Sequence, residues 1–177
     1  MTQEALFAGF GGQGVLSMGQ ILAYAGMIEG KEVCWMPSYG PEMRGGTANC
    51  ITIVSDSAIS SPIISMYDTV VALNQPSVDK FESRVKKGGN LIYDSANILN
   101  PPTRTDINII PVQGSEEAIK LQNTKVLNMV MLGAFLKKTN CVAVENIHKA
   151  LEKVFERYQK LIPLNIKALE VGMSYIK

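Results

Sequence analysis

The residues best suited to chemistry in this sequence are glycines close to its start. Four of them, Gly9, Gly11, Gly12 and Gly14, fall between an apolar run and a stretch with helical spacing. Such a cluster costs conformational entropy and therefore indicates a backbone shape that other side chains would forbid. Between a strand and a helix, the spacing G-x-G-x-x-G brings backbone amides and the positive end of a helix dipole against a phosphate. The alternative is a tight turn whose glycines serve only packing.

Two familiar phosphate-binding motifs are incomplete around these glycines. A nicotinamide enzyme also carries an acidic residue about 20 residues further on, at the end of the second strand. Here Glu29 and Glu32 precede the second apolar run instead of ending it. A lysine followed by serine or threonine is absent after the glycines, which argues against a nucleoside triphosphatase P-loop. The motif therefore predicts an anion site without naming its ligand.

A second loop, "PSYGPEMRGGTAN" at residues 37–49, places Arg44 among prolines, glycines and hydroxyl side chains. An arginine beside glycines can offer a fork of donors to a phosphate or carboxylate while the backbone stays close. The alternative is that Arg44 and Glu42 are ordinary loop charges facing water. Two such loops at one sheet edge favour the anion site.

The elements that position these loops follow from hydrophobic spacing. Apolar strands are expected at residues 4–10, 32–36, 48–55, 69–73, 90–95 and 107–112. Helices are expected at 15–30, from near Pro76 to Gly88–Gly89, and from Ser115 onward. The last helical region is expected to break at Thr139–Asn140 and at Pro163. Apolar strands alternating with helices predict an α/β fold. We expect a three-layer Rossmann-like domain with a mainly parallel sheet, helices on both faces and a helical C-terminal third. Both glycine-rich loops then lie at the carboxyl ends of strands.

Length and composition indicate a single globular domain over residues 1–177, with 46% hydrophobic and 19% charged residues. A formal net charge of +1 without a basic cluster predicts binding neither to nucleic acid nor to a membrane surface. No apolar run approaches the roughly 20 residues of a membrane helix, and no leader pattern begins the chain, so a cytoplasmic location is expected. The mean hydropathy of +0.10 suggests extra surface buried against partners.

The side chains that most often bind metals or move protons are few. Cys34, Cys50 and Cys141 are far apart and lack the spacing of a zinc or iron–sulfur site, so we expect them to be buried apolar residues. The one histidine, His148, lies in the amphipathic stretch "VENIHKALEKVFERY", where an ordinary helical position is favoured over acid–base chemistry. No catalytic or metal-binding residue is expected in this chain.

Several longer stretches carry a resemblance to a known family. They are "GFGGQGV" at 9–15, "PSYGPEMRGGTANC" at 37–50, "SPI" at 61–63, "ALNQPS" at 72–77, "NMVMLGA" at 128–134 and "NIKALEVG" near the end. The sequence resembles the gamma subunit, or gamma domain, of 2-oxoacid:ferredoxin (acceptor) oxidoreductases. It is most similar to the 2-oxoglutarate type, and branched-chain 2-oxoacid members are also similar.

The resemblance implies a subunit of a cytoplasmic enzyme that oxidatively decarboxylates a 2-oxoacid to an acyl-coenzyme A. It places thiamine diphosphate, magnesium and iron–sulfur clusters in partner alpha, beta and ferredoxin-like delta subunits, with ferredoxin or another acceptor taking the electrons. This chain, inactive alone, would help to bind coenzyme A at a subunit interface.

The residues that the resemblance and the two loops assign to coenzyme A are Gly9, Gly11, Gly12, Gln13, Gly14, Ser38, Arg44, Gly45, Gly46 and Thr47. A different class of protein, a stand-alone nucleotide-binding or regulatory module, would use the same glycine motif. A third possibility is that the glycine loops only pack subunits together.

Overall fold

The fold is built on a six-stranded sheet in a computed structural model that describes residues 1–39 and 47–177. Its strands are β1 (Thr2–Phe10), β2 (Glu32–Tyr39), β3 (Thr47–Ser55), β4 (Tyr67–Ala72), β5 (Val85–Asp94) and β6 (Asn108–Val112), in the spatial order β2-β3-β1-β4-β5-β6. β3 pairs antiparallel with both β1 and β2, whereas β4, β5 and β6 follow β1 in parallel. Only β3 therefore runs against the others in this sheet, and the predicted mainly parallel α/β sheet is confirmed.

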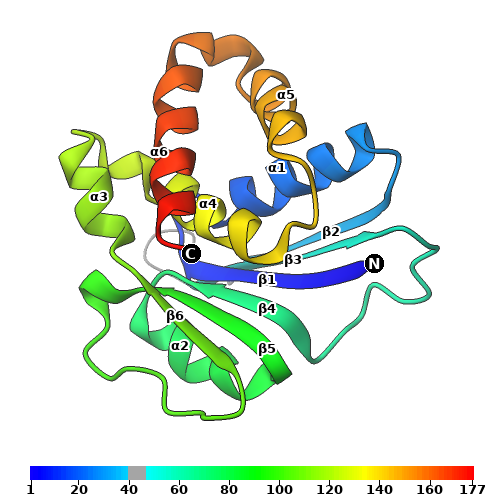
Figure 1. Cartoon of the computed structure of the whole chain (residues 1–177), viewed down its shortest axis with the longest axis vertical. Helices are drawn as coiled ribbons and strands as arrows, with labels where there is room; N and C mark the ends of the chain where they lie inside the picture. The colour runs from blue at the N-terminus through cyan, green and yellow to red at the C-terminus, as the bar shows by residue number, and fades with distance from the viewer. Residues whose placement is uncertain (40–46) are drawn as a thin grey trace.

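Helices cover both faces of the sheet unequally (Figure 1). They are α1 (Val15–Ile28), α2 (Gln75–Phe81), α3 (Gly114–Lys120), α4 (Leu127–Thr139), α5 (Val144–Val154) and α6 (Ile162–Ser174). One face, with α2, buries Leu6, Val78 and Phe81 in a smaller cluster. The other face carries the larger core, which α1, α4, α5 and α6 share. The three layers are thus a helix, the sheet and a thicker helical layer.

Helix α4 is buried almost all round because it lies between the sheet and α6. All its residues from Leu127 to Leu136 are buried, and the Phe135 ring meets Phe7 of β1 edge-on with centroids 5.3 Å apart. Burying such a large aromatic side chain contributes about 1.5–3 kcal/mol. This contact joins α4 to β1, and the helix also contacts the neighbouring strands β4 and β5.

Several predicted boundaries were wrong, each for a local reason. β2 continues through Pro37 to Tyr39, because it is an edge strand, where proline is tolerated. The helix that begins near Pro76 ends at Phe81 and a short 3-10 turn, so Gly88 and Gly89 belong to β5 instead of closing the helix. By contrast, the predicted break near Pro163 agrees with the structure, because Pro163 lies in the first turn of α6, where its missing N–H costs nothing.

Other expectations agree with the structure. Asn140 ends α4 in the left-handed conformation, at the predicted break. Cys50 and Cys141 are buried free thiols as expected, and Cys34 is half-buried. Burial is the main cause that raises the pKa of the Cys50 thiol to about 12, so it stays protonated and unreactive at neutral pH. In the described part of the chain, no helix combines the length and apolar character needed to cross a membrane.

The packing of α4 against α6 depends on two glycines that allow the helices to touch. A Cβ at Gly172 would overlap the carbonyl oxygen of Val130, and one at Gly133 would overlap that of Leu169. Both obstacles are helix backbone, which cannot rotate away as a side chain can. The two helices would therefore have to move apart to accept a methyl group at either position.

We predict that Gly172→Ala lowers the free energy of unfolding by about 1–3 kcal/mol, the usual cost of overpacking a core. The measurement is chemical denaturation of the purified chain. Glu170→Ala, at an exposed position of the same helix, is the matched control and should change stability by less than about 0.5 kcal/mol. Equal effects of the two substitutions would contradict close packing at Gly172.

Candidate functional site

Strand register brings the two predicted loops to one edge of the sheet. Gly9 at the end of β1 pairs with Ala48 of β3, and Ala48 pairs in turn with Tyr39 at the end of β2. Neighbouring strands lie about 4.8 Å apart, so both ends of the segment 40–46 are anchored beside the glycine turn. The expectation that the two loops share a sheet edge is thus met by the residues that flank them.

Ser38 and Thr47 nevertheless point away from the face where α1 lies. Ser38 pairs with Asn49 of β3, and Asn49 pairs in turn with Ala8 of β1. Thr47 pairs with Phe10 of β1. Paired residues share a face, and Ala8 belongs to the apolar cluster on the α2 side. Both hydroxyl residues therefore belong to the opposite face from α1. The other residues assigned to the second loop, Arg44, Gly45 and Gly46, lie outside the described residues.

The glycine turn is closed by its own glutamine. The backbone N–H of Phe10 donates to Gln13 Oε1 at 2.6 Å, and the Gln13 N–H donates to the Phe10 carbonyl at 3.2 Å. Gly12 and Gly14 have φ angles of +93° and +75°, which side chains rarely adopt. Within the described chain, no side chain caps the start of α1, so its first N–H groups remain available to an anion.

Gly14 also has a packing role that sequence reasoning did not separate from ligand binding. A Cβ on Gly14 would overlap the side-chain amide of Asn128, which lies at the beginning of α4. That amide donates a hydrogen bond to the Gly14 carbonyl at 3.2 Å. The glycine is therefore required by its left-handed backbone and by its neighbour, whether or not a ligand binds.

A crevice of about 380 Å³ opens beside the glycine turn. Its walls come from the turn itself, the residues after β5, helix α3 and the segment that leads into α4. The lining residues are Gly12, Gln13, Asn97, Ser115, Ile119, Thr124, Lys125 and Leu127. The crevice thus occupies the carboxyl edge of the parallel strands, where open α/β sheets bind ligands.

A buried carboxylate, Asp94 at the end of β5, organises one wall of the crevice. It accepts hydrogen bonds from the Ser115 hydroxyl, from the Ser115 N–H at 3.1 Å and from the Ala96 N–H at 3.4 Å. Asn97 Nδ2 approaches the Ser115 hydroxyl oxygen at 3.1 Å and Asp94 Oδ2 at 3.4 Å. Because its oxygens are occupied in this way, Asp94 fixes the positions of two lining side chains.

Helix α3 is held against the C-terminal end of the chain by Tyr175. The Tyr175 hydroxyl donates to Glu117 Oε1 at 3.0 Å, and Lys120 Nζ lies 2.8 Å from the same oxygen. Burial, followed by the hydrogen bond to Glu117, raises the pKa of Tyr175 to about 12. The Lys120 hydrogen bond is the main cause that lowers the pKa of Glu117. At neutral pH the phenol therefore keeps its proton and the carboxylate its charge, which maintains this contact.

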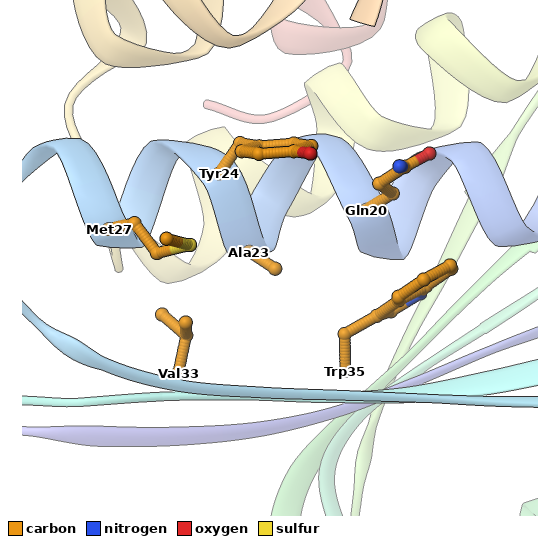
Figure 2. Close-up of a pocket in the computed structure, with 6 residues that line it drawn as sticks. All are labelled: Gln20, Ala23, Tyr24, Met27, Val33 and Trp35. Atoms are coloured by element: carbon orange, nitrogen blue, oxygen red, sulfur yellow. The ribbon is translucent and has the colours of Figure 1, made fainter.

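A second hollow, of about 280 Å³, lies between α1 and the edge strand β2 (Figure 2). Val33 and Trp35 rise from the strand toward the helix, and Ala23 and Met27 reach down to them. The remaining lining side chains are Gln20 and Tyr24, so none of the described residues that line this hollow is charged. Its mainly apolar lining suits apolar contact more than it suits a phosphate.

The structure therefore divides the predicted site. Gly12 and Gln13 line the crevice, whereas Gly9, Gly11 and Gly14 belong to the end of β1 and the turn that follows. Ser38 and Thr47 lie on the face of the sheet opposite α1.

Sequence reasoning missed five polar residues that line or support the crevice: Asp94, Asn97, Ser115, Thr124 and Lys125. The available signal was position, because Asp94 ends a strand predicted to reach the same edge. In the described ranges, no group of three or more His, Cys, Asp or Glu side chains is placed to hold a metal ion.

Comparison with known proteins agrees with this architecture. Residues 4–175 match the family described as pyruvate ferredoxin/flavodoxin oxidoreductase, and the chain belongs to this family. Within it, the chain corresponds to the gamma subunits of keto- and oxoacid oxidoreductases. The gamma subunit of keto/oxoacid ferredoxin oxidoreductase from Geobacter sulfurreducens superimposes with a TM-score of 0.83 at 31% identity, covering 98% of this chain and 97% of that one.

Two relatives differ in the substrate that they are named for. The ketoisovalerate oxidoreductase subunit VorA of Methanothermobacter thermautotrophicus is 39% identical over 96% of this chain. The 2-oxoglutarate synthase subunit KorC of Methanocaldococcus jannaschii is 35% identical, covering 85% of this chain and 82% of KorC. The chain spans about a third of VorA, at 35% of its length.

We predict that Gly14→Ala lowers the free energy of unfolding by about 2 kcal/mol, since a positive φ alone costs roughly 1–2 kcal/mol and the overlap with Asn128 adds to it. Asn128→Ala removes the overlap, so the alanine at position 14 should cost less in that background. Gly12→Ala, with positive φ and open space, reports the backbone cost alone. Denaturation of the single and double variants measures the coupling. An identical cost of Gly14→Ala in both backgrounds would show that Asn128 does not restrict position 14.

Proposed function

We propose that this chain is the gamma subunit of a 2-oxoacid:ferredoxin oxidoreductase that forms an acyl-coenzyme A, and that it contributes to coenzyme A binding. The observation that carries the proposal is the family match over nearly the whole chain, combined with a glycine turn that leaves helix N–H groups available at the edge of the sheet. Thiamine diphosphate, magnesium and iron–sulfur clusters would belong to alpha, beta and ferredoxin-like delta partners. We further propose that the enzyme acts in the cytoplasm.

The proposed substrate is 2-oxoglutarate, as in the KorC relatives. Ketoisovalerate is the second candidate, because the VorA relative has the higher identity, 39% against 35%. Among the described residues, Lys125 and the Thr124 hydroxyl line the crevice, and they suit an anionic ligand in general. We therefore assign choice of the 2-oxoacid to the partner subunits.

The contribution of this chain is to bind and orient. Coenzyme A supplies the thiol that accepts the acyl group in such a reaction. The N–H groups at the start of α1 would hold a phosphate of that molecule, with Arg44, Gly45 and Gly46 of the second loop contributing from the same edge. A ligand fixed in this way has its remaining length directed outward, toward partner subunits. Correct positioning of a reactant lowers the entropic part of the barrier for the step that follows.

The test is reconstitution. The chain, produced together with candidate alpha, beta and delta subunits, should co-purify with them, and the complex should reduce an acceptor dye only when a 2-oxoacid and coenzyme A are both present. Turnover with 2-oxoglutarate should exceed turnover with ketoisovalerate at equal concentrations, and the chain alone should give none. A chain that purifies without partners, or a complex without coenzyme A-dependent turnover on any 2-oxoacid, would refute the proposed function.

A further inference from the structure

We propose that the crevice binds the phosphorylated, nucleotide end of coenzyme A and that Lys125 is the cation that contacts its phosphate. This inference rests on the proposed function, because it takes coenzyme A as the ligand. It goes further by assigning the ligand's orientation and by naming a binding residue that neither glycine motif contains. In this inference the phosphate contacts the glycine turn and also the wall of the crevice that α3 and the segment before α4 form.

The chemistry of the crevice selects an anion. Lys125 and Thr124 line it, while Ser115 and Asn97 direct their donors to Asp94 and to each other. Among the described lining side chains, a phosphate would therefore meet the positive charge of Lys125 and the hydroxyl of Thr124. Over residues 1–39 and 47–177, no carboxylate lies within 4.0 Å of the Lys125 ammonium group. The lysine is thus available to a ligand.

Two of the carboxylates nearby, Asp94 and Glu117, are already engaged. Asp94 is fully buried and accepts hydrogen bonds from Ser115, Ala96 and Asn97. Glu117 lies beside Lys120 and accepts the Tyr175 hydroxyl, while Glu116, exposed on the first turn of α3, is the remaining carboxylate of that wall. Lys120 is paired with Glu117, so among the described residues Lys125 is the cation that lines the crevice without a carboxylate partner.

Size and polarity decide which end of coenzyme A is held. Ligand sites for small molecules measure about 300–1,000 Å³, so 380 Å³ fits part of coenzyme A rather than all of it. All three phosphate groups of coenzyme A belong to its nucleotide end, whereas the pantetheine arm is uncharged. Leu127 and Ile119, which is 63% exposed, add apolar surface for the adenine ring or the beginning of the arm. The thiol at the far end would then extend away from this chain.

The experiment uses the assembled enzyme and compares Lys125→Ala with the wild type. The apparent KM for coenzyme A should rise about tenfold, as expected for the loss of a charged hydrogen bond, with kcat unchanged at saturation. Lys125→Arg should retain most of the affinity, because the positive charge is kept. Calorimetric titration of the complex with coenzyme A supplies a readout independent of turnover.

Two controls make the result specific. Lys137→Ala, an exposed lysine near the far end of α4 and roughly 18 Å away by helix rise, should leave the KM for coenzyme A unchanged. Measurements with 3′-dephospho-coenzyme A locate the contact. If Lys125→Ala still weakens binding of this analogue, Lys125 contacts the pyrophosphate. If the substitution no longer weakens binding, Lys125 contacts the 3′-phosphate. Size-exclusion chromatography confirms that each variant assembles, and Lys125→Gln replaces the alanine variant if that variant does not.

The possible failures are distinguishable. An assembled, coenzyme A-dependent Lys125→Ala enzyme with a KM and a calorimetric affinity within twofold of the wild type would overturn this inference and leave the proposed function standing. A wild-type complex without coenzyme A-dependent turnover would instead remove the proposed function, and this inference with it. An equal loss in Lys137→Ala would reduce the effect to general electrostatics and would also overturn the assignment.

Discussion

The central position of β1 is the constraint on which the rest of the molecule depends. It is the strand that pairs antiparallel with β3 on one side and in parallel with β4 on the other, so it joins the two kinds of pairing in the sheet. Its side chains alternate between the two cores, with Phe7 against Phe135 of α4 and Leu6 in the cluster under α2. A slip of one residue would exchange these sets. The register of β1 therefore fixes the layers and the place where the glycine turn emerges.

The contacts that fix the glycine turn against the start of α4 do not require a ligand. Gln13 closes the turn on Phe10, and the amide of Asn128 occupies the space a side chain at Gly14 would need. Asn128 lies in the first turn of α4, and Phe135 of that helix packs on Phe7 of β1, so the turn, the strand and the helix constrain one another. A rigid turn of this kind is preorganised, because a ligand does not have to order it. The glycine motif thus has a structural cause that is compatible with the proposed binding use.

The sequence was sufficient for the fold class because its strands are strongly apolar and their order with the helices restricts the topology. It placed the break at Asn140 correctly, and it placed both loops at one edge. The prediction that the second strand ends before Pro37 was wrong. An edge strand tolerates proline, and which strand lies at the edge is known only from the tertiary structure. The prediction also failed at Gly88 and Gly89, where pairing within the sheet overrides the usual role of glycine as a helix end.

The crevice was beyond sequence reasoning for a different reason. Gly12 and Gln13 belong to the glycine motif, but its other polar residues come from positions 97, 115 and 124–125, which belong to no local pattern. Asp94 joins Ser115 and Asn97 only because β5 ends where α3 begins. With a net charge of +1, the chain as a whole exerts little long-range attraction on an anion, so recognition has to come from groups at short range. A site assembled from scattered, individually ordinary residues around a glycine turn meets that requirement.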